Sequence, residues 1–135
     1  MRKEDLEAIP PEECWGLLKT VSIGRLALSV RALPAILPVQ YYLDGDEIAA
    51  CLGFFEVPLQ AVRHTVVAFA ADAFDEQALT GWSVQAQGTV RLDHQLDEAA
   101  CGDPTFGTIV RLTPATMSGH RVRLCPLLGA AGSLG

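Results

Sequence analysis

The sequence predicts a mostly β fold, a small antiparallel barrel of short strands in a single domain. Residues 33–53, LPAILPVQYYLDGDEIAACLG, are typical of two strands joined by a tight turn at 44–46, because Asp-Gly is a strong hairpin signal and Gly accepts positive φ. Residues 82–92, WSVQAQGTVRL, alternate apolar and polar side chains, which is the period of a strand buried on one face. Turn residues separate the other short apolar runs, and this spacing favours a barrel.

The chain before the hairpin is predicted to hold one short helix and one strand. Residues 10–13, PPEE, indicate a helix start, since proline suits the first turn and carboxylates favour its positive end. An apolar stripe follows at helical spacing, made by Cys14, Leu17 and Leu18. Residues 25–30, RLALSV, have the composition of a strand.

Pro38 interrupts the first strand of the hairpin. Because proline has no N–H to donate, it predicts either an edge position or a bulge. A bulge would also expose backbone groups to a ligand, whereas an edge strand would be purely structural. The residues alone support the two interpretations equally.

The chain after the hairpin is predicted to alternate between helices, strands and turns. Residues 65–71, TVVAFAA, are nearly all apolar, so we expect a strand buried on both faces or at an interface. The acidic stretch 72–81 is expected to be an exposed loop. Short helices are predicted at 54–62 and 95–100, the last two strands at 108–112 and 119–124, and a flexible Gly-rich tail at 125–135.

Composition narrows the class of partner. Half of the 135 residues are hydrophobic and only 19% are charged, which fits burial in an oligomer. The net charge of −6 opposes binding to nucleic acid. The longest apolar run, 66–71, is far shorter than the roughly 20 residues of a membrane span. Residues 1–10 start with charged side chains rather than a signal-peptide pattern and are expected to be flexible, so we expect a cytoplasmic protein that does not act at a membrane.

No motif predicts a metal or a catalytic group. The cysteines form no CxxC pair and have no histidine at zinc-ligand spacing, so we expect neither a metal site nor a disulfide. The four cysteines are Cys14, Cys51, Cys101 and Cys125. The three histidines are His64, His94 and His120, and they lie on different predicted segments. Each is therefore interpreted as a polar surface residue rather than a catalytic one. Catalytic residues are therefore unknown. Trp82 and Ser83 together could border a planar ligand, or they could equally have a purely structural role in packing.

Four segments in this order resemble the pyridoxamine 5′-phosphate oxidase-like family, in particular the small members common in actinobacteria. The segments are GRLALSV at 24–30, PAILPVQYYLDGDEI at 34–48, TVVAFAADAFD at 65–75 and TGWSVQAQGTVRL at 80–92. The resemblance implies a six-stranded antiparallel split β-barrel with a few short peripheral helices over residues 11–124. It also implies a homodimer that holds FMN, or in some branches F420 or haem, in two equivalent clefts between subunits.

The same resemblance places the cofactor beside the first strand of the hairpin. The residues that it assigns to the cofactor there are Leu37, Pro38, Val39 and Gln40, with Trp82 and Ser83 near them. Related members hold the cofactor phosphate with an Arg-Thr-Gly pattern and a following Lys. Here those positions are Cys51, Leu52, Gly53 and Val57.

A phosphate needs cationic donors, so this substitution predicts weak or absent binding of FMN or F420. Glu56 adds a negative charge, and Arg63 is the nearest cation in the sequence. Two functions follow. One is a flavin- or F420-dependent oxidoreductase acting on a small molecule, with catalysis left open. The other is a non-catalytic split-barrel homologue that binds an apolar ligand or a protein partner, which the apolar segment 52–59, LGFFEVPL, favours.

Overall fold

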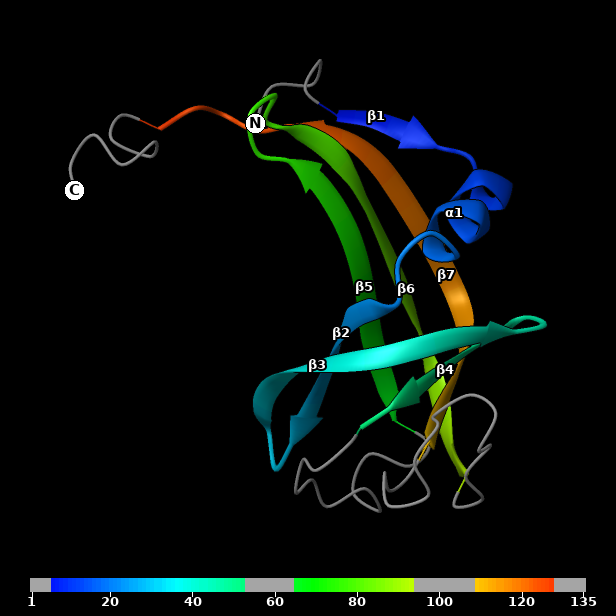
Figure 1. Ribbon diagram of the computed structural model, residues 1–135. Coiled ribbons are helices and arrows are strands. Elements are labelled where there is room, and N and C mark those ends of the chain that lie inside the picture. Colours follow the sequence, from blue (N-terminus) through cyan, green and yellow to red (C-terminus); the bar gives the residue numbers. More distant parts are fainter. Residues whose placement is uncertain (1–5, 53–64, 94–108, 128–135) are drawn as a thin grey trace.

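The computed structural model describes residues 6–52, 65–93 and 109–127 (Figure 1). One helix and seven strands lie in these residues. In chain order they are β1 (Leu6–Ile9), α1 (Pro11–Leu18), β2 (Ile23–Val30), β3 (Leu33–Asp44), β4 (Glu47–Cys51), β5 (Val66–Asp75), β6 (Thr80–Asp93) and β7 (Ile109–Arg123). The helices predicted at 54–62 and 95–100 fall outside the described residues.

Six of the strands close into a barrel. The hydrogen-bonded order β7-β4-β3-β2-β5-β6 returns to β7 through the β6–β7 pairing, and every pairing is antiparallel. β7 is long enough to hold β4 at one end and β1 at the other. Figure 1 shows β5, β6 and β7 running as long curved strands past the short β4, with α1 beside β7. The predicted six-stranded antiparallel barrel is confirmed.

The hairpin β3–β4 forms as predicted. Asp44 pairs with Glu47, and Gly45 has a φ of 61° in the turn between them. A second tight turn joins β2 to β3 at Arg31 and Ala32, whose φ values of 53° and 65° are left-handed. Side chains at both positions make this turn costlier than the Asp-Gly turn.

Among the described residues, Pro38 has a strand partner on one side. β3 pairs with β2 along residues 33–40, but its described pairing with β4 begins only at Gln40. The β2–β3 register runs without interruption through Pro38, opposite Arg25. No bulge occurs at Pro38 in the described pairings. The chain that follows Leu52, which the register would place opposite Pro38, lies outside the described residues, so the edge interpretation stays a prediction.

One prediction for β5 was wrong and another stays open. The segment 72–81 is not a loop, because β5 continues to Asp75 and β6 begins at Thr80. Asp72 forms an ion pair with Arg25 on the sheet, and Asp75 closes the short turn by accepting hydrogen bonds from two following N–H groups. Within this chain β5 is buried on one face, since its side chains alternate and Val66 is 70% exposed, so burial at an interface stays a prediction.

The two strands predicted at 108–112 and 119–124 are one strand. β7 passes through Pro114 at an irregularity where Gln87 pairs with Thr116 and Gly88 with Pro114, which leaves one residue extra. The missing N–H of proline is tolerated at such a bulge. A Cβ on Gly88 would lie 2.1 Å from the Thr113 carbonyl oxygen, so glycine is required opposite the bend.

The N-terminal strand was also not expected. Leu6–Ile9, in a segment predicted to be flexible, forms β1 and pairs with residues 119–122 of β7. Cys14 and Leu18 of α1 are fully buried, as the apolar stripe predicted. Contrary to expectation, Cys51 is in a disulfide.

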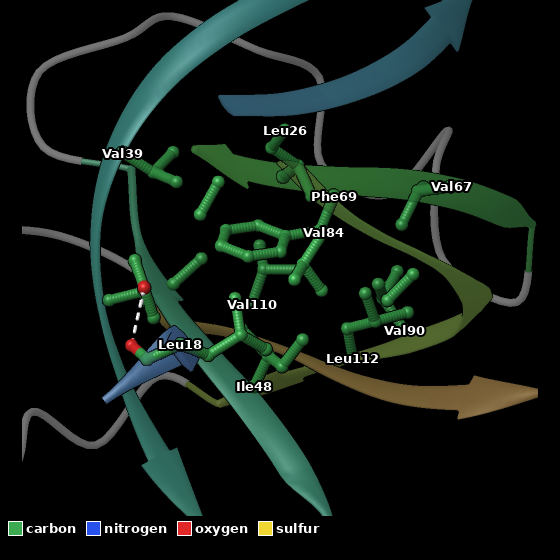
Figure 2. Close-up of a cluster of buried hydrophobic side chains, with 14 of the residues drawn as sticks. Leu18, Leu26, Val39, Ile48, Val67, Phe69, Val84, Val90, Val110 and Leu112 are labelled. Carbon is green, nitrogen blue, oxygen red and sulfur yellow. Dashed lines mark hydrogen bonds between the residues drawn. The ribbon is translucent and has the colours of Figure 1, made fainter. Parts of the chain in front are cut away.

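The barrel interior is a continuous apolar core (Figure 2). Its largest fully buried side chain is Phe69, whose ring meets that of Tyr41 edge to face at 4.9 Å. The Tyr41 hydroxyl donates a hydrogen bond to the Leu18 carbonyl at 2.6 Å, which ties α1 to β3. In the described part of the chain, no helix is long and apolar enough to cross a membrane.

Candidate functional site

The side of the sheet that faces away from the barrel core, called here the outer face, is the candidate ligand surface. The strand register aligns Pro38, Arg25, Ala70 and Gln85 in one row across β3, β2, β5 and β6. The next row consists of Ile36, Ala27, Ala68 and Gln87. The middle positions of these two rows are thus three alanines and Arg25.

Large apolar side chains surround these alanines. Ile23, Ile36 and Val66 are between 67% and 70% exposed, which is high for such residues in a soluble domain. A hollow of about 230 Å³ lies on the same face. It is lined by Ala27, Leu28, Ser29, Pro34, Val66, Val67, Ala68 and Gln87. The outer face therefore offers an apolar, shallow surface.

The β3 segment assigned to a cofactor divides between the two sides of the sheet. Pro38 and Gln40 are exposed on the outer face, whereas Val39 is buried in the core and Leu37 packs against it. Residues 33–39 have a strand partner on only one side in the described pairings. Their outward backbone N–H and C=O groups can therefore hydrogen-bond a ligand, although the Leu37 and Val39 side chains do not face it.

Trp82 and Ser83 do not act as a pair. Neighbouring residues of a strand point to opposite faces, so Trp82 lies in the core while Ser83 lies on the outer face between Asp72 and His120. β2 and β5 separate β3 from β6, which places Pro38 about 14 Å from the β6 residue in its row. A ligand on the outer face can contact the side chain of Ser83 but not that of Trp82.

The described end of β4 supplies no cation for a phosphate. Cys51 lies opposite Gln40, so its side chain is on the outer face, but it is disulfide-bonded. The Leu52 side chain is 3% exposed and belongs to the core. Gly53, Val57 and Arg63 lie outside the described residues.

Arg25 is the cation that the sequence interpretation missed. It lies directly opposite Pro38, its side chain is 49% exposed on the outer face, and it forms an ion pair with Asp72. The alternation in residues 24–30 already indicates that Arg25 points away from Leu26 and Leu28. What the sequence did not show was the strand order that brings Arg25 beside the β3 segment.

The sequence interpretation also missed Arg111, which lies at the centre of a second charged group. Its guanidinium donates hydrogen bonds to Asp44 at 2.9 Å, to Asp93 at 3.1 Å and to the Tyr42 hydroxyl at 3.1 Å. Burial acts to lower the pKa of Arg111, but these carboxylates outweigh it and raise the pKa. The cluster links the β3–β4 turn to β6 and β7, so we assign it to the fold rather than to ligand binding.

The described residues show neither a metal centre nor a catalytic histidine. No group of three potential metal ligands occurs among the described residues. His120 is half-buried on the outer face, opposite Ser83, and His64 and His94 lie outside the described residues.

Comparison with known proteins identifies the family. Residues 10–121 match the family model described as pyridoxamine 5′-phosphate oxidase. The uncharacterized protein Rv0080 of Mycobacterium tuberculosis is 30% identical over 125 residues, with 82% of each chain covered.

Solved structures agree with this assignment. The FAD-binding protein of Mycobacterium smegmatis superposes with a TM-score of 0.68 at 25% identity, covering 87% of this chain and 99% of that one. An FAD-binding protein of Mesorhizobium loti shares the fold with a TM-score of 0.68 at 16% identity, covering 86% and 96%. The closed ring of six antiparallel strands and the match over residues 10–121 lead to one conclusion: the chain belongs to the pyridoxamine 5′-phosphate oxidase family and has its split-barrel fold.

Proposed function

We propose that this protein binds a flavin-type cofactor at the open edge of β3, between two copies of the chain, and holds the cofactor phosphate only weakly. The observation that carries the proposal is that residues 33–39 pair on one side only within the described part of the chain, beside an exposed apolar face. Backbone groups at such an edge match the polar rim of a flavin ring, and the apolar face suits its flat surface. The FAD-binding neighbours support this class of ligand.

The second copy of the chain supplies the other wall of the cleft. Ile23, Ile36 and Val66 would remain in water in a monomer, and burying them is favourable by about 25 cal/mol per Å². The 14 Å between β3 and β6 also keeps one chain from enclosing a ligand by itself. We expect the interface to exceed roughly 1,000 Å². Light scattering should show a dimer, and Ile36→Glu should shift it toward monomer.

Binding of the phosphate is expected to be weak. The described part of β4 presents Cys51 and Leu52 where a phosphate site would need cations, and Arg25 is the nearest described cation to Pro38. Each charge-assisted hydrogen bond contributes about 1.5–3 kcal/mol, so the loss of two weakens binding by roughly a hundredfold or more. Riboflavin, which lacks the phosphate, should therefore bind about as well as FMN.

Titration of the protein with riboflavin, FMN, FAD and F420 tests this proposal. Cys51→Arg should increase affinity for FMN over riboflavin, because the new guanidinium points to the outer face beside Gln40. Cys51→Ser is the matched control, since it also removes the disulfide but adds no charge. Nanomolar FMN binding by the natural chain, or binding of none of the four compounds, would contradict the proposal.

Once bound, the flavin would supply hydride transfer, and the chain would orient it. Oxidoreductase activity on a small molecule is therefore the activity that we propose. The alternative is a non-catalytic protein that uses the outer face for an apolar ligand, which the hollow above Ala27 and Ala68 favours. Turnover of a reduced cofactor by the flavin-loaded protein distinguishes the two.

A further inference from the structure

A second pocket lies on the opposite side of the sheet from the outer face. It has a volume of about 380 Å³ and is located where the ends of β6 and β7 lie beside β1 (Figure 1). Its lining residues are Glu7, Thr80, Gly81, Trp82, Arg121, Val122 and Arg123. This volume is within the range of small-molecule sites. Of the residues assigned to the cofactor, only Trp82 lines it.

Two arginines mark the chemistry of this pocket. Arg121 and Arg123 are two residues apart on β7, so both side chains extend from the same face of the strand. The register places Arg121 between Glu7 and Trp82, and Arg123 opposite Thr80. Two guanidinium groups beside a hydroxyl form a donor set suited to an oxyanion.

The ion pair with Glu13 does not use up the donors of Arg121. Arg121 bonds to Glu13 through one terminal nitrogen, and both side chains of this pair are about half exposed. A guanidinium carries five N–H donors, so an added oxyanion can share it. Such exposed pairs are weak and are easily rearranged.

Trp82 adds an apolar wall and a free donor. Its side chain is 9% exposed, and it borders this pocket. None of the described residues accepts a hydrogen bond from its indole N–H. Every buried polar side-chain atom in the described part of the chain has a partner, so this unbonded N–H is not buried. The N–H is therefore accessible, and Trp82 is one of the residues that line the pocket.

We propose that this pocket binds a small organic oxyanion, a carboxylate or phosphate ester joined to an aromatic ring. The guanidinium groups of Arg121 and Arg123 bind the charged end, and the ring packs against Trp82. The site is separate from the proposed flavin cleft because it lies on the opposite face of the sheet. It does not depend on the flavin proposal, and either can fail without the other.

Tryptophan fluorescence provides the test. The Trp15→Phe variant leaves Trp82 as the only indole, and it is titrated with phenyl phosphate, benzoate, inorganic phosphate and the neutral benzamide. We expect saturable changes with phenyl phosphate and benzoate, weaker binding of inorganic phosphate, and none with benzamide. The first two compounds distinguish a phosphate ligand from a carboxylate.

Charge variants then locate the site. Arg123→Gln and Arg121→Gln should each weaken binding about tenfold or more. Glu13→Gln and Glu7→Gln should strengthen binding several-fold, since each removes a competing carboxylate. Arg91→Gln is the matched control, because Arg91 is an exposed, ion-paired residue of β6 that is remote from the pocket.

Three outcomes would overturn the proposal: no saturable change with any anion, equal binding of benzamide, or an effect of Arg91→Gln as large as that of Arg123→Gln. Because Arg121→Gln could loosen α1, its binding is interpreted only if circular dichroism matches that of the parent. Glu13→Gln removes the same ion pair, so tighter binding by this variant cannot come from lost structure.

Discussion

Replacement of Arg111 should destabilise the barrel more than replacement of any exposed arginine. The substitution Arg111→Met keeps the apolar stem but removes the guanidinium, whose side chain is only 10% exposed. It breaks the hydrogen bonds to Asp93, Asp44 and Tyr42. Asp93 and Glu47, which are 27% and 17% exposed, would then lie partly buried without this cation.

The magnitude follows from the exposure of each partner. The hydrogen bond to Asp93 is largely shielded and contributes about 2 kcal/mol, and the bond to Tyr42 about 1 kcal/mol. The pair with Asp44 adds less than about 1 kcal/mol, because this carboxylate is 61% exposed. The total loss is therefore about 3 kcal/mol, a large part of the 5–15 kcal/mol or so that stabilises a typical domain.

Urea unfolding followed by circular dichroism measures this loss. The midpoint should fall while the slope stays unchanged, since the folded and unfolded surfaces change little. The control is Arg121→Met, which breaks an exposed pair with Glu13 and should cost only about 0–1 kcal/mol. Equal effects of the two variants, or a loss below about 1 kcal/mol for Arg111→Met, would refute the reasoning.

Three further outcomes are expected. Burial raises the pKa of Tyr41 from 10.0 to about 12, so the free energy of unfolding should be constant below pH 10 and fall by up to about 3 kcal/mol toward pH 12. In Tyr41→Phe the urea midpoint should fall less between pH 10 and pH 12, and an equal fall in both proteins would contradict this. The left-handed turn at Arg31 and Ala32 should be relieved by Arg31→Asn with Ala32→Gly, raising stability by about 1 kcal/mol in a thermal melt, whereas a lower melting temperature would show that the turn is not strained. Burial and, to a smaller extent, the charge of Glu13 raise the pKa of the Cys14 thiol. A thiol reagent should therefore label the exposed Cys125 first and Cys14 only on unfolding, and equal labelling rates in the native protein would disprove this.

The local features of the fold were predictable because they depend on neighbouring residues. The Asp-Gly turn of β3–β4 and the alternation of β6 are encoded over a few positions, and both are present as expected. Pro114 misled the prediction for the same local reason. Proline usually ends a strand, but the bulge opposite Gly88 lets β7 continue, and such compensation from a partner strand is not visible in β7 itself.

The charged groups could not be predicted, because they join distant parts of the chain. Arg111 meets Asp44 across 67 residues and Asp93 across 18, and no local pattern links these positions. Arg25 was assigned to a strand correctly, but its place beside Pro38 depends on the order of strands around the barrel. The family resemblance supplied the fold, and only the register showed which side chains share a face.

The alternation of side chains between the two faces of β4 also determines which substitutions could create a phosphate site. On β4, Cys51 points to the outer face and Leu52 into the core. A cation at position 51 would therefore reach the ligand side, whereas a polar residue at position 52 would be buried among apolar side chains and destabilise the barrel by about 1–3 kcal/mol. The barrel core depends on Leu52 and not on a charge beside it, so the fold is compatible with a cation at position 51. We expect Leu52→Thr to lower stability without improving FMN binding, while Cys51→Arg improves binding. Better FMN binding by Leu52→Thr would show that residue 52 faces the ligand and that the register argument is wrong.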